Sequence, residues 1–445
     1  MAVSQSDALH LFRRTGLSIP LQSTGPLLSM SRAELVDWVL DVGQNPTVGF
    51  APAGRDWQST QSVKAWWVDR MASVPRPFEE RLVLFWHNHF TSANRKVSDA
   101  VLMWNQNQLF RSLGSGDFSE LAKAASIDPA MLVWLDGGYS TKWGPNENFS
   151  RELLELFLLG VNNGYSEFDV REMARAWTGH TFVRDANDEV IGHELKANRH
   201  DSTSKTLFGV TAPWEGTQVL DAMIVSGGQL EHMRPVVARH LSKKLWLWFA
   251  GTTPNPELHA RLAAMLGSTP RMNIGSFLRS MFNLDDFYAP EVKAGLVRDP
   301  LLWIATMLRT SGLNFNTAHV DWYLDQLSMV PLDPPNVAGW KPNRSWISAS
   351  AFWKRAETAW TMFDTARKAA PAGVNFLGDV TALSATAVVS KALDVFGEDR
   401  ISDGSTTWSA LVALVEADRA DNSSSWAVVS NLARAIAISP EYSMA

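Results

Sequence analysis

NENFSRELLELFLLGVNNGYSEFDVREMARAWTG, residues 146–179, is the stretch that predicts most about the fold of this chain. Its pattern indicates two helices joined by a turn with two glycines, which often end helices. Asn146 suits the N-cap position of the first helix, because its side chain can accept a hydrogen bond from a free backbone N–H group. Ser166 and Asp169 resemble a capping box, which predicts that the second helix begins there.

The first of these helices combines two apolar faces with a narrow polar flank. Leucine and phenylalanine side chains occupy both broad faces, so we expect the helix to be nearly enclosed. Asn148, Glu152 and Glu155 share the remaining flank. An unpaired carboxylate in the interior costs several kcal/mol or shifts its pKa, so these glutamates need partners. We therefore expect Glu152 to be buried and paired with an arginine or a histidine, and Glu152→Ala to cost about 3–5 kcal/mol.

Three short motifs in the same stretch carry a family resemblance. They are Asn-Glu-Asn at 146–148, Arg-Glu-Leu-Leu-Glu-Leu at 151–156 and Thr-Gly at 178–179. The chain resembles the bacterial family catalogued as domain of unknown function 1800 (DUF1800), over nearly its full length. The biochemical role of that family is not established, so the resemblance implies positions rather than a reaction. Because family members often occur beside genes for sulfatase-like proteins, it also implies a sulfatase-like protein as a candidate partner.

Length and composition favour one large helical domain. The chain has 445 residues, and no linker rich in serine, glycine or proline divides it. Helical periodicity runs through almost all of it, apart from residues 180–210, where the pattern predicts a small β-hairpin. We therefore expect a mainly α-helical fold, a single multi-helical domain over residues 1–445 with one small β-hairpin insertion.

The composition also argues against several classes of function. The net charge of −6 is spread along the chain, which argues against nucleic acid as a partner. Without cysteine there are no disulfides, thiolate nucleophiles or cysteine-ligated zinc sites. No stretch has the length of a membrane span, and the first residues lack the pattern of a secretory signal. We expect a cytoplasmic protein, with export by another route left open.

The segment 78–90 contains two histidines that suggest two interpretations. Helical periodicity places His89 on the apolar face, and His87 then lies roughly 160° away on the helical wheel. A His-x-His pair could bind zinc, but on a helix the two rings diverge, and zinc needs three or four converging ligands. We expect His89 to be a hydrogen-bonded core residue and His87 a surface residue, and we assign no metal ligand. The motif Trp-His-Asn-His-Phe at 86–90 resembles the family, which keeps His89 among the candidate site residues.

A polar segment after residue 179 also resembles the family. His200 and Asp201, followed by Lys205, match its His-Asp and lysine pattern. As an alternative, Asp201 and Lys205 could simply pair across a turn. His180 stands where the family usually has tryptophan, which could change the wall of a pocket.

The loop 334–340, Pro-Pro-Asn-Val-Ala-Gly-Trp, resembles a further family motif. Its prolines fix the backbone and its glycine permits a tight turn, so it should hold Trp340 rigidly. Most of the 20 tryptophans lie at helical spacing beside leucine and valine, which favours core packing over sugar binding. Trp340 and Trp346 are exceptions, and we expect this loop to form part of a pocket rim.

Two functions fit this inventory. The first is a hydrolase in which carboxylates in unlike environments, or a histidine, activate water by acid–base chemistry, with a metal-assisted variant. The candidate catalytic residues, which must converge on one pocket, are Glu152, Glu155, His89, Arg151, His200, Asp201 and Lys205, and the candidate substrate-binding residues are Asn146, Asn148, Trp340 and Trp346. The second is a non-catalytic binding or assembly partner of a sulfatase-like protein, in which the same residues form a structural network. The sequence identifies no cofactor.

Overall fold

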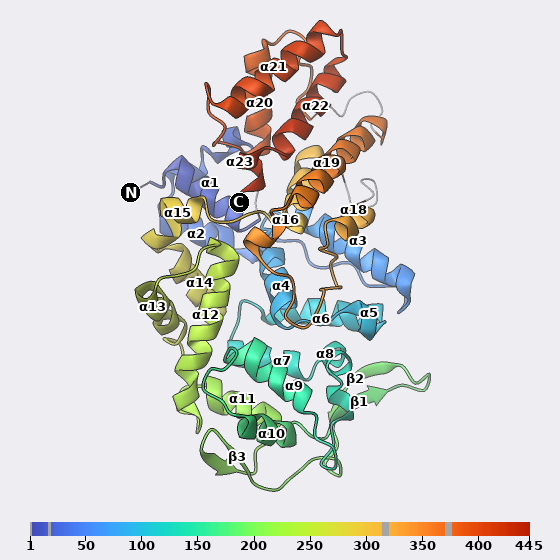
Figure 1. Cartoon of the computed structure of the whole chain (residues 1–445), viewed down its shortest axis with the longest axis vertical. Helices are drawn as coiled ribbons and strands as arrows, with labels where there is room; N and C mark the ends of the chain where they lie inside the picture. The colour runs from blue at the N-terminus through green and yellow to red at the C-terminus, as the bar shows by residue number, and fades with distance from the viewer. Residues whose placement is uncertain (1, 17–18, 314–319, 370–375) are drawn as a thin grey trace.

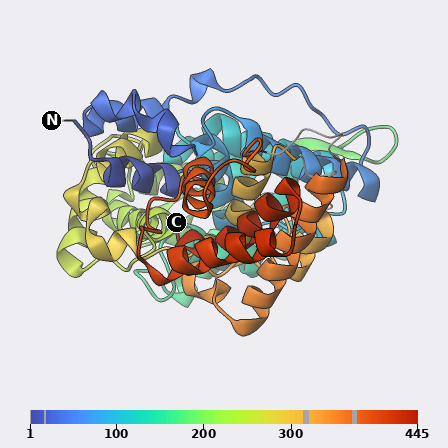
Figure 2. The same ribbon diagram turned by 90° about the horizontal axis from the view of Figure 1, so that it is seen from above.

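The computed structural model describes residues 2–16, 19–313, 320–369 and 376–445. It confirms a mainly α-helical fold, in which the only sheets of the described residues are two small antiparallel pairs. In Figure 1 the helices α20 (Ala385–Phe396), α21 (Thr406–Ala420) and α22 (Ser425–Ala437) form one end of the long axis. Seen from above, they lie in front of the other helices (Figure 2). No helix in the described ranges is long and apolar enough to cross a membrane.

The remaining elements follow in chain order. The helices up to residue 176 are α1 (Gln5–Arg14), α2 (Arg32–Leu40), α3 (Trp57–Ser73), α4 (Phe78–His89), α5 (Asn94–Val97), α6 (Ala100–Leu113), α7 (Phe118–Ser126), α8 (Pro129–Trp134), α9 (Glu147–Glu152), the π-helix Leu153–Leu158 and α10 (Glu167–Ala176). The later helices are α11 (Gly216–Ile224), α12 (Arg234–Ala250), α13 (Pro256–Leu266), α14 (Ile274–Phe282), α15 (Pro290–Lys293), α16 (Pro300–Ser311), α18 (Val320–Gln326), α19 (Ala349–Ala369) and α23 (Pro440–Ser443). Short 3₁₀ turns lie at Leu21–Thr24, Leu27–Ser29, Val42–Gln44, Gly137–Tyr139, Glu231–Met233, Asp285–Tyr288 and Asn343–Trp346.

The β-hairpin predicted within residues 180–210 is present. β1 (His180–Arg184) pairs with β2 (Val190–Leu195) in antiparallel register, with Phe182 opposite His193. A second pair, β3 (Lys205–Leu207) and β4 (Val210–Ala212), follows. β3 contacts α10, so this β region packs on the second helix of the stretch 146–179.

Buried hydrophobic side chains form one large cluster that includes residues from Val3 to Tyr442. Trp86, Trp177 and Trp246 are buried in it, as their helical spacing predicts, and Trp66 packs against it partly buried. Core packing thus accounts for these four tryptophans.

Glu80 of α4 is a fully buried carboxylate that joins three helices. Arg70 of α3 donates to its Oε1 at 2.6 Å, and Arg111 of α6 donates to both oxygens, at 3.0 and 2.6 Å. Trp67 of α3 donates its indole N–H at 2.9 Å. A buried charge is tolerated when it is paired and its lone pairs are satisfied. Glu80 therefore fixes the packing of the helix that carries His89.

We expect Glu80→Gln to lower the free energy of unfolding by about 3–5 kcal/mol, because two interior arginines lose their shared counter-charge. Glu79→Gln is the matched control, since Glu79 also contacts Arg70, at 3.0 Å, from a partly exposed position. Its loss should be at most about 1 kcal/mol. Urea unfolding followed by circular dichroism measures both variants, and equal losses would contradict the role of Glu80.

Candidate functional site

The helix predicted to begin at Asn146 changes its geometry halfway along. Asn146 is the N-cap of α9, and its Oδ1 accepts from the backbone N–H of Phe149 at 3.1 Å, as predicted. From Leu153 to Leu158 the chain is a π-helix. A π-helical turn alters which backbone groups are bonded within the helix, and such turns are frequent at functional sites. The regular apolar pattern of residues 149–159 does not predict it.

The polar flank of this helix lies at the surface. Glu152 is only partly buried and forms no ion pair or hydrogen bond among the described residues, so its predicted pairing is wrong. Burial and then the charge of Glu155 raise its pKa. Glu155 lies 3.8 Å from Arg151, whose shorter ion pair, at 2.6 Å, is with Glu167. Asn148 is exposed. The two carboxylates on this flank need no interior partner, because solvent reaches them.

Three side chains converge on two carbonyl oxygens of the π-helix. Nε2 of the buried His89 is 3.0 Å from the carbonyl oxygen of Phe157. From α12, Nε2 of His240 and Nζ of Lys244 each lie 3.1 Å from the carbonyl oxygen of Leu156. His89 is thus a hydrogen-bonded core residue, as expected. His240 and Lys244 were not identified from the sequence, although residues four apart share a helix face.

Burial dominates the electrostatics of this group. It lowers the pKa of His89 well below its usual range, and the charges of Lys244 and His240 act in the same direction. Burial likewise lowers the pKa of His240 to about 4 and that of Lys244 to about 7. The folded protein therefore holds both histidines neutral at neutral pH, with Lys244 near its midpoint.

His87 is buried, so the expectation of a surface histidine is wrong. Its ring centroid is 5.7 Å from the rings of both Trp67 and Trp340, and burial lowers its pKa to about 3. The reason is that α4 is covered on both sides, by α3 and by the loop that carries Trp340. Within the described ranges, no three histidine, aspartate or glutamate side chains form a group that could hold a metal ion.

Asn88, between the two histidines, anchors the proline-rich loop. Its Oδ1 accepts from the backbone N–H of Trp340 at 2.6 Å, and its Nδ2 donates to the carbonyl oxygen of Trp340 at 3.4 Å. Gly339 has φ of +78°, and a Cβ there would lie 2.2 Å from Oδ1 of Asn88. Trp340 is only 4 % exposed, so most of its ring is buried in the core.

The segment that contains His200, Asp201 and Lys205 is held by hydrogen bonds to α10 and to the residues that directly follow it. Nδ1 of His200 is 2.8 Å from the carbonyl oxygen of Thr178, and the Asp201 carboxylate accepts from Arg175 at 2.8 Å. Although burial acts to raise the pKa of Asp201, bonds from Thr203 and Arg175 lower it to about 2.

Lys205 is held by backbone oxygens. Its Nζ donates to the carbonyl oxygens of Asp201 and Trp214. Lys205 thus contacts Asp201, as the alternative interpretation expects, but it binds the backbone carbonyl oxygen. The Asp201 carboxylate pairs with Arg175 instead.

Three titratable side chains are linked in series by hydrogen bonds at the base of the hairpin, and we call this series the Glu215–His193 chain. Oε1 of Glu215 is 2.8 Å from Nε2 of His180, and Nδ1 of His180 is 2.8 Å from Nε2 of His193. His180 is buried and His193 is partly exposed. Diagonal neighbours on paired strands share one face of a sheet, which is how the two histidines meet. The sequence contains a signal for this contact, since both histidines lie in the segment 180–210 that is predicted to contain the hairpin.

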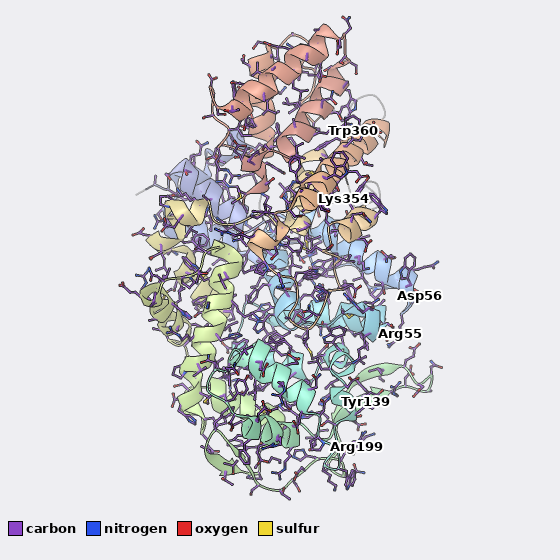
Figure 3. The ribbon with its side chains drawn as sticks, in the orientation of Figure 1. Arg55, Asp56, Tyr139, Arg199, Lys354 and Trp360 are labelled. Atoms are coloured by element: carbon purple, nitrogen blue, oxygen red, sulfur yellow. The ribbon has the colours of Figure 1, made fainter. Side chains whose placement is uncertain are left out.

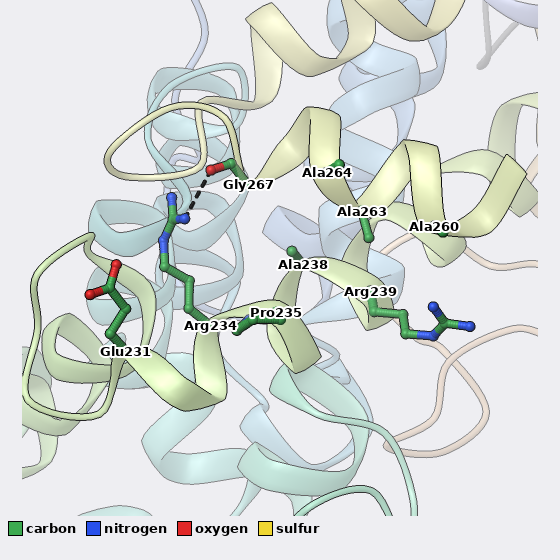
Figure 4. A pocket seen from close by; sticks show the side chains of 9 residues that line it. All are labelled: Glu231, Arg234, Pro235, Ala238, Arg239, Ala260, Ala263, Ala264 and Gly267. Atoms are coloured by element: carbon green, nitrogen blue, oxygen red, sulfur yellow. Dashed lines mark hydrogen bonds between the residues drawn. The ribbon is translucent and has the colours of Figure 1, made fainter. Parts of the chain in front are cut away.

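Two surface grooves are not lined by any of the predicted site residues. One, of about 420 Å³, lies between α12 and α13, where Arg234 donates to the carbonyl oxygen of Gly267 at 2.8 Å (Figure 4). The other, of about 790 Å³, lies beside Asn343. The space at Trp340 and Trp346 is only about 10 Å³, room for roughly one water molecule.

Lys244 makes stability depend on pH. Its pKa of about 7 in the folded protein is below the usual lysine value of about 10.4, so between these values the unfolded chain binds the extra proton. Stability should rise with pH across this window, by at most about 1.4 kcal/mol per unit, and be lost as pH falls through about 7. In Lys244→Met this rise should disappear, whereas exposed Lys243→Met should retain it. Urea unfolding over the pH range measures it, and parallel curves for wild type and Lys244→Met would contradict the assignment.

None of the curated proteins and none of the solved structures matches this chain. Residues 10–444 match the model of one family, described as "Protein of unknown function (DUF1800)". The matched region contains the motifs at 86–90, 146–156 and 334–340. Because the match covers nearly the whole chain, the protein belongs to the DUF1800 family of unknown function.

Proposed function

We propose that the protein is a hydrolase that uses carboxylate–histidine acid–base chemistry, with His193 as its general base. The observation that carries the proposal is the hydrogen-bonded chain from Glu215 through His180 to His193. A histidine that is oriented by a second group, which is itself held by a carboxylate, follows the logic of known hydrolytic triads. The proposal moves the acid–base centre away from His89, His200 and Asp201, whose side chains bond to backbone or to Arg175.

We assign one tautomer to each histidine ring. Burial opposes ionisation of Glu215, but bonds from His180 and Thr217 lower its pKa to about 2, so the carboxylate only accepts. Nε2 of His180 donates to it, and in this assignment Nδ1 of His180 accepts from Nε2 of His193. This leaves the lone pair on Nδ1 of His193, at the partly exposed end of the chain.

That nitrogen can activate water. Nδ1 takes a proton from a water molecule as its oxygen attacks the scissile bond, and the same proton later passes to the leaving group. The carboxylate of Glu215 favours the positive charge that forms on His193. Burial, and then His180, lower the pKa of His193 to about 4, so the imidazole is unprotonated at neutral pH. Activity should therefore be flat around neutrality and fall as pH drops through about 4.

We expect His193→Gln to reduce hydrolysis by about 100-fold or more, because general-base catalysis contributes on that order. Glu215→Gln should reduce it too, since the developing charge loses its carboxylate. His259→Gln is the control, because His259 is partly exposed and is not one of the three linked side chains. The assay is hydrolysis of p-nitrophenyl esters, phosphates and glycosides over a pH series. No turnover of these substrates by the wild type, or unchanged turnover by His193→Gln, would contradict the proposal.

The exposed tryptophans favour a second function, assembly with a sulfatase-like protein. Trp57, Trp143, Trp353 and Trp360 are between 61 and 75 % exposed. In Figure 3, Asp56, Tyr139, Lys354 and Trp360 lie along one side of the molecule, and Trp57 and Trp353 are chain neighbours of two of them. Exposed aromatic side chains are enriched at protein interfaces because they bury large apolar areas. The occupant proposed here is the sulfatase-like partner that the family resemblance implies.

For this second function, we expect Trp353→Ser combined with Trp360→Ser to weaken binding of a sulfatase-like protein from the same source by at least about tenfold. Phe168→Ser, which changes an exposed aromatic residue of α10, is the matched control. Isothermal titration calorimetry measures the dissociation constants. Absence of binding by the wild type, or equal binding by both variants, would exclude assembly through this surface.

A further inference from the structure

The groove between α12 and α13 is a surface cavity of about 420 Å³. Its lining residues are Glu231, Arg234, Pro235, Ala238, Arg239, Ala260, Ala263, Ala264 and Gly267. Apolar atoms make up most of the lining surface. Pockets that bind small molecules usually have volumes of about 300–1,000 Å³ and mainly apolar walls with a few polar groups. The groove therefore has the size and the surface of a ligand site, and none of its residues belongs to the Glu215–His193 chain.

The groove exists because the two helices meet through small side chains. In Figure 4, Ala238 of α12 lies below Ala263 and Ala264 of α13. Ala238 is buried and forms the floor, whereas Ala264 is exposed at the rim. Because each of these side chains ends at Cβ, no longer side chain fills the space between the helices. The result is an apolar trough that a hydrocarbon chain can occupy.

One end of the groove carries one charge of each sign. Arg234 is fixed there, since its guanidinium donates to the carbonyl oxygens of Gly267 and Ile224, each at 2.8 Å. Glu231 lies at the same end (Figure 4). A bound anionic group gains little at this end, because the carboxylate of Glu231 opposes it.

Arg239 lies at the opposite end, beside Ala260 (Figure 4). Its side chain is exposed and forms no ion pair or hydrogen bond among the described residues. A guanidinium group presents parallel N–H donors that match the two oxygens of a carboxylate. This end of the groove therefore has a positive charge without a counter-charge, next to an apolar trough.

We propose that the groove binds a small monocarboxylate with an apolar body, such as a medium-chain fatty acid. The carboxylate pairs with Arg239, and the hydrocarbon chain lies along the alanines toward Gly267. Charge complementarity sets this orientation, because Glu231 excludes a second anionic group from the far end. The site lies outside the proposed hydrolase centre and does not depend on it.

The test is isothermal titration calorimetry of the full chain with octanoate, acetate and octylammonium. We expect one octanoate to bind per chain. Acetate should bind at least about tenfold more weakly, because it lacks the hydrocarbon that removes groove surface from water. Octylammonium should also bind at least about tenfold more weakly, because Arg239 repels its charge. No saturable binding of octanoate, or equal binding of either comparison ligand, would overturn the proposal.

A pair of arginine variants tests the carboxylate contact. Arg239→Gln should weaken octanoate binding by at least about tenfold, because the counter-charge of the ligand is lost. Arg261→Gln is the matched control, since Arg261 of α13 pairs with Asp286 and does not line the groove. It should retain the affinity of the wild type. Equal affinities of the two variants would contradict the role of Arg239 and overturn the proposal.

A pair of alanine variants tests the trough. Ala264→Phe places a ring in the groove from an exposed position, so it should abolish octanoate binding while the melting temperature stays that of the wild type. Ala410→Phe, at an exposed position of α21, is the matched control. Unchanged octanoate binding by Ala264→Phe would overturn the proposal. A wild-type dimer in light scattering that Ala264→Phe converts to a monomer, without octanoate binding, would instead assign the groove to a second copy of the chain.

Discussion

The carbonyl oxygens of Leu156 and Phe157 impose the constraint on which the centre of the molecule depends. Interior backbone acceptors have to be satisfied, and in this π-helical segment side chains from other helices do so. α4 supplies His89, and α12 supplies His240 and Lys244. Three segments far apart in the sequence therefore meet at one helix end. The consequence is a group of interior bases whose ionisation opposes folding, which couples packing at the centre to pH.

Asn88 brings two family motifs into contact. It lies in the motif at 86–90 and bonds to the backbone of the loop that ends in Gly339 and Trp340. Arg95, shortly after, donates to the carbonyl oxygens of Pro334 and Pro335, so the same part of the chain holds the loop at two points. Docking of the loop onto α4 accounts for residues that would otherwise suggest a metal pair or a sugar-binding surface.

Some buried charges in this protein have all of their hydrogen-bond and ion-pair partners, and others do not. This difference distinguishes structural residues from candidate functional residues. Glu80 has all of its partners, which indicates a packing role. The chain from Glu215 to His193 is satisfied at its buried end and accessible at the other, as acid–base chemistry requires. The same physical rule, that a buried charge needs a partner, therefore leads to different conclusions at these two places.

The sequence by itself determined the helical fold, the hairpin near residue 180, the caps at Asn146 and Ser166, and the family, because these depend on local periodicity and short motifs. It did not determine which charges are buried. Glu152 was expected inside and Glu80 was overlooked, since burial depends on which helices cover a face, and that is decided by contacts between distant segments. His180 and His193 meet only through strand register. Tertiary structure alone brings such groups close enough for their charges to interact.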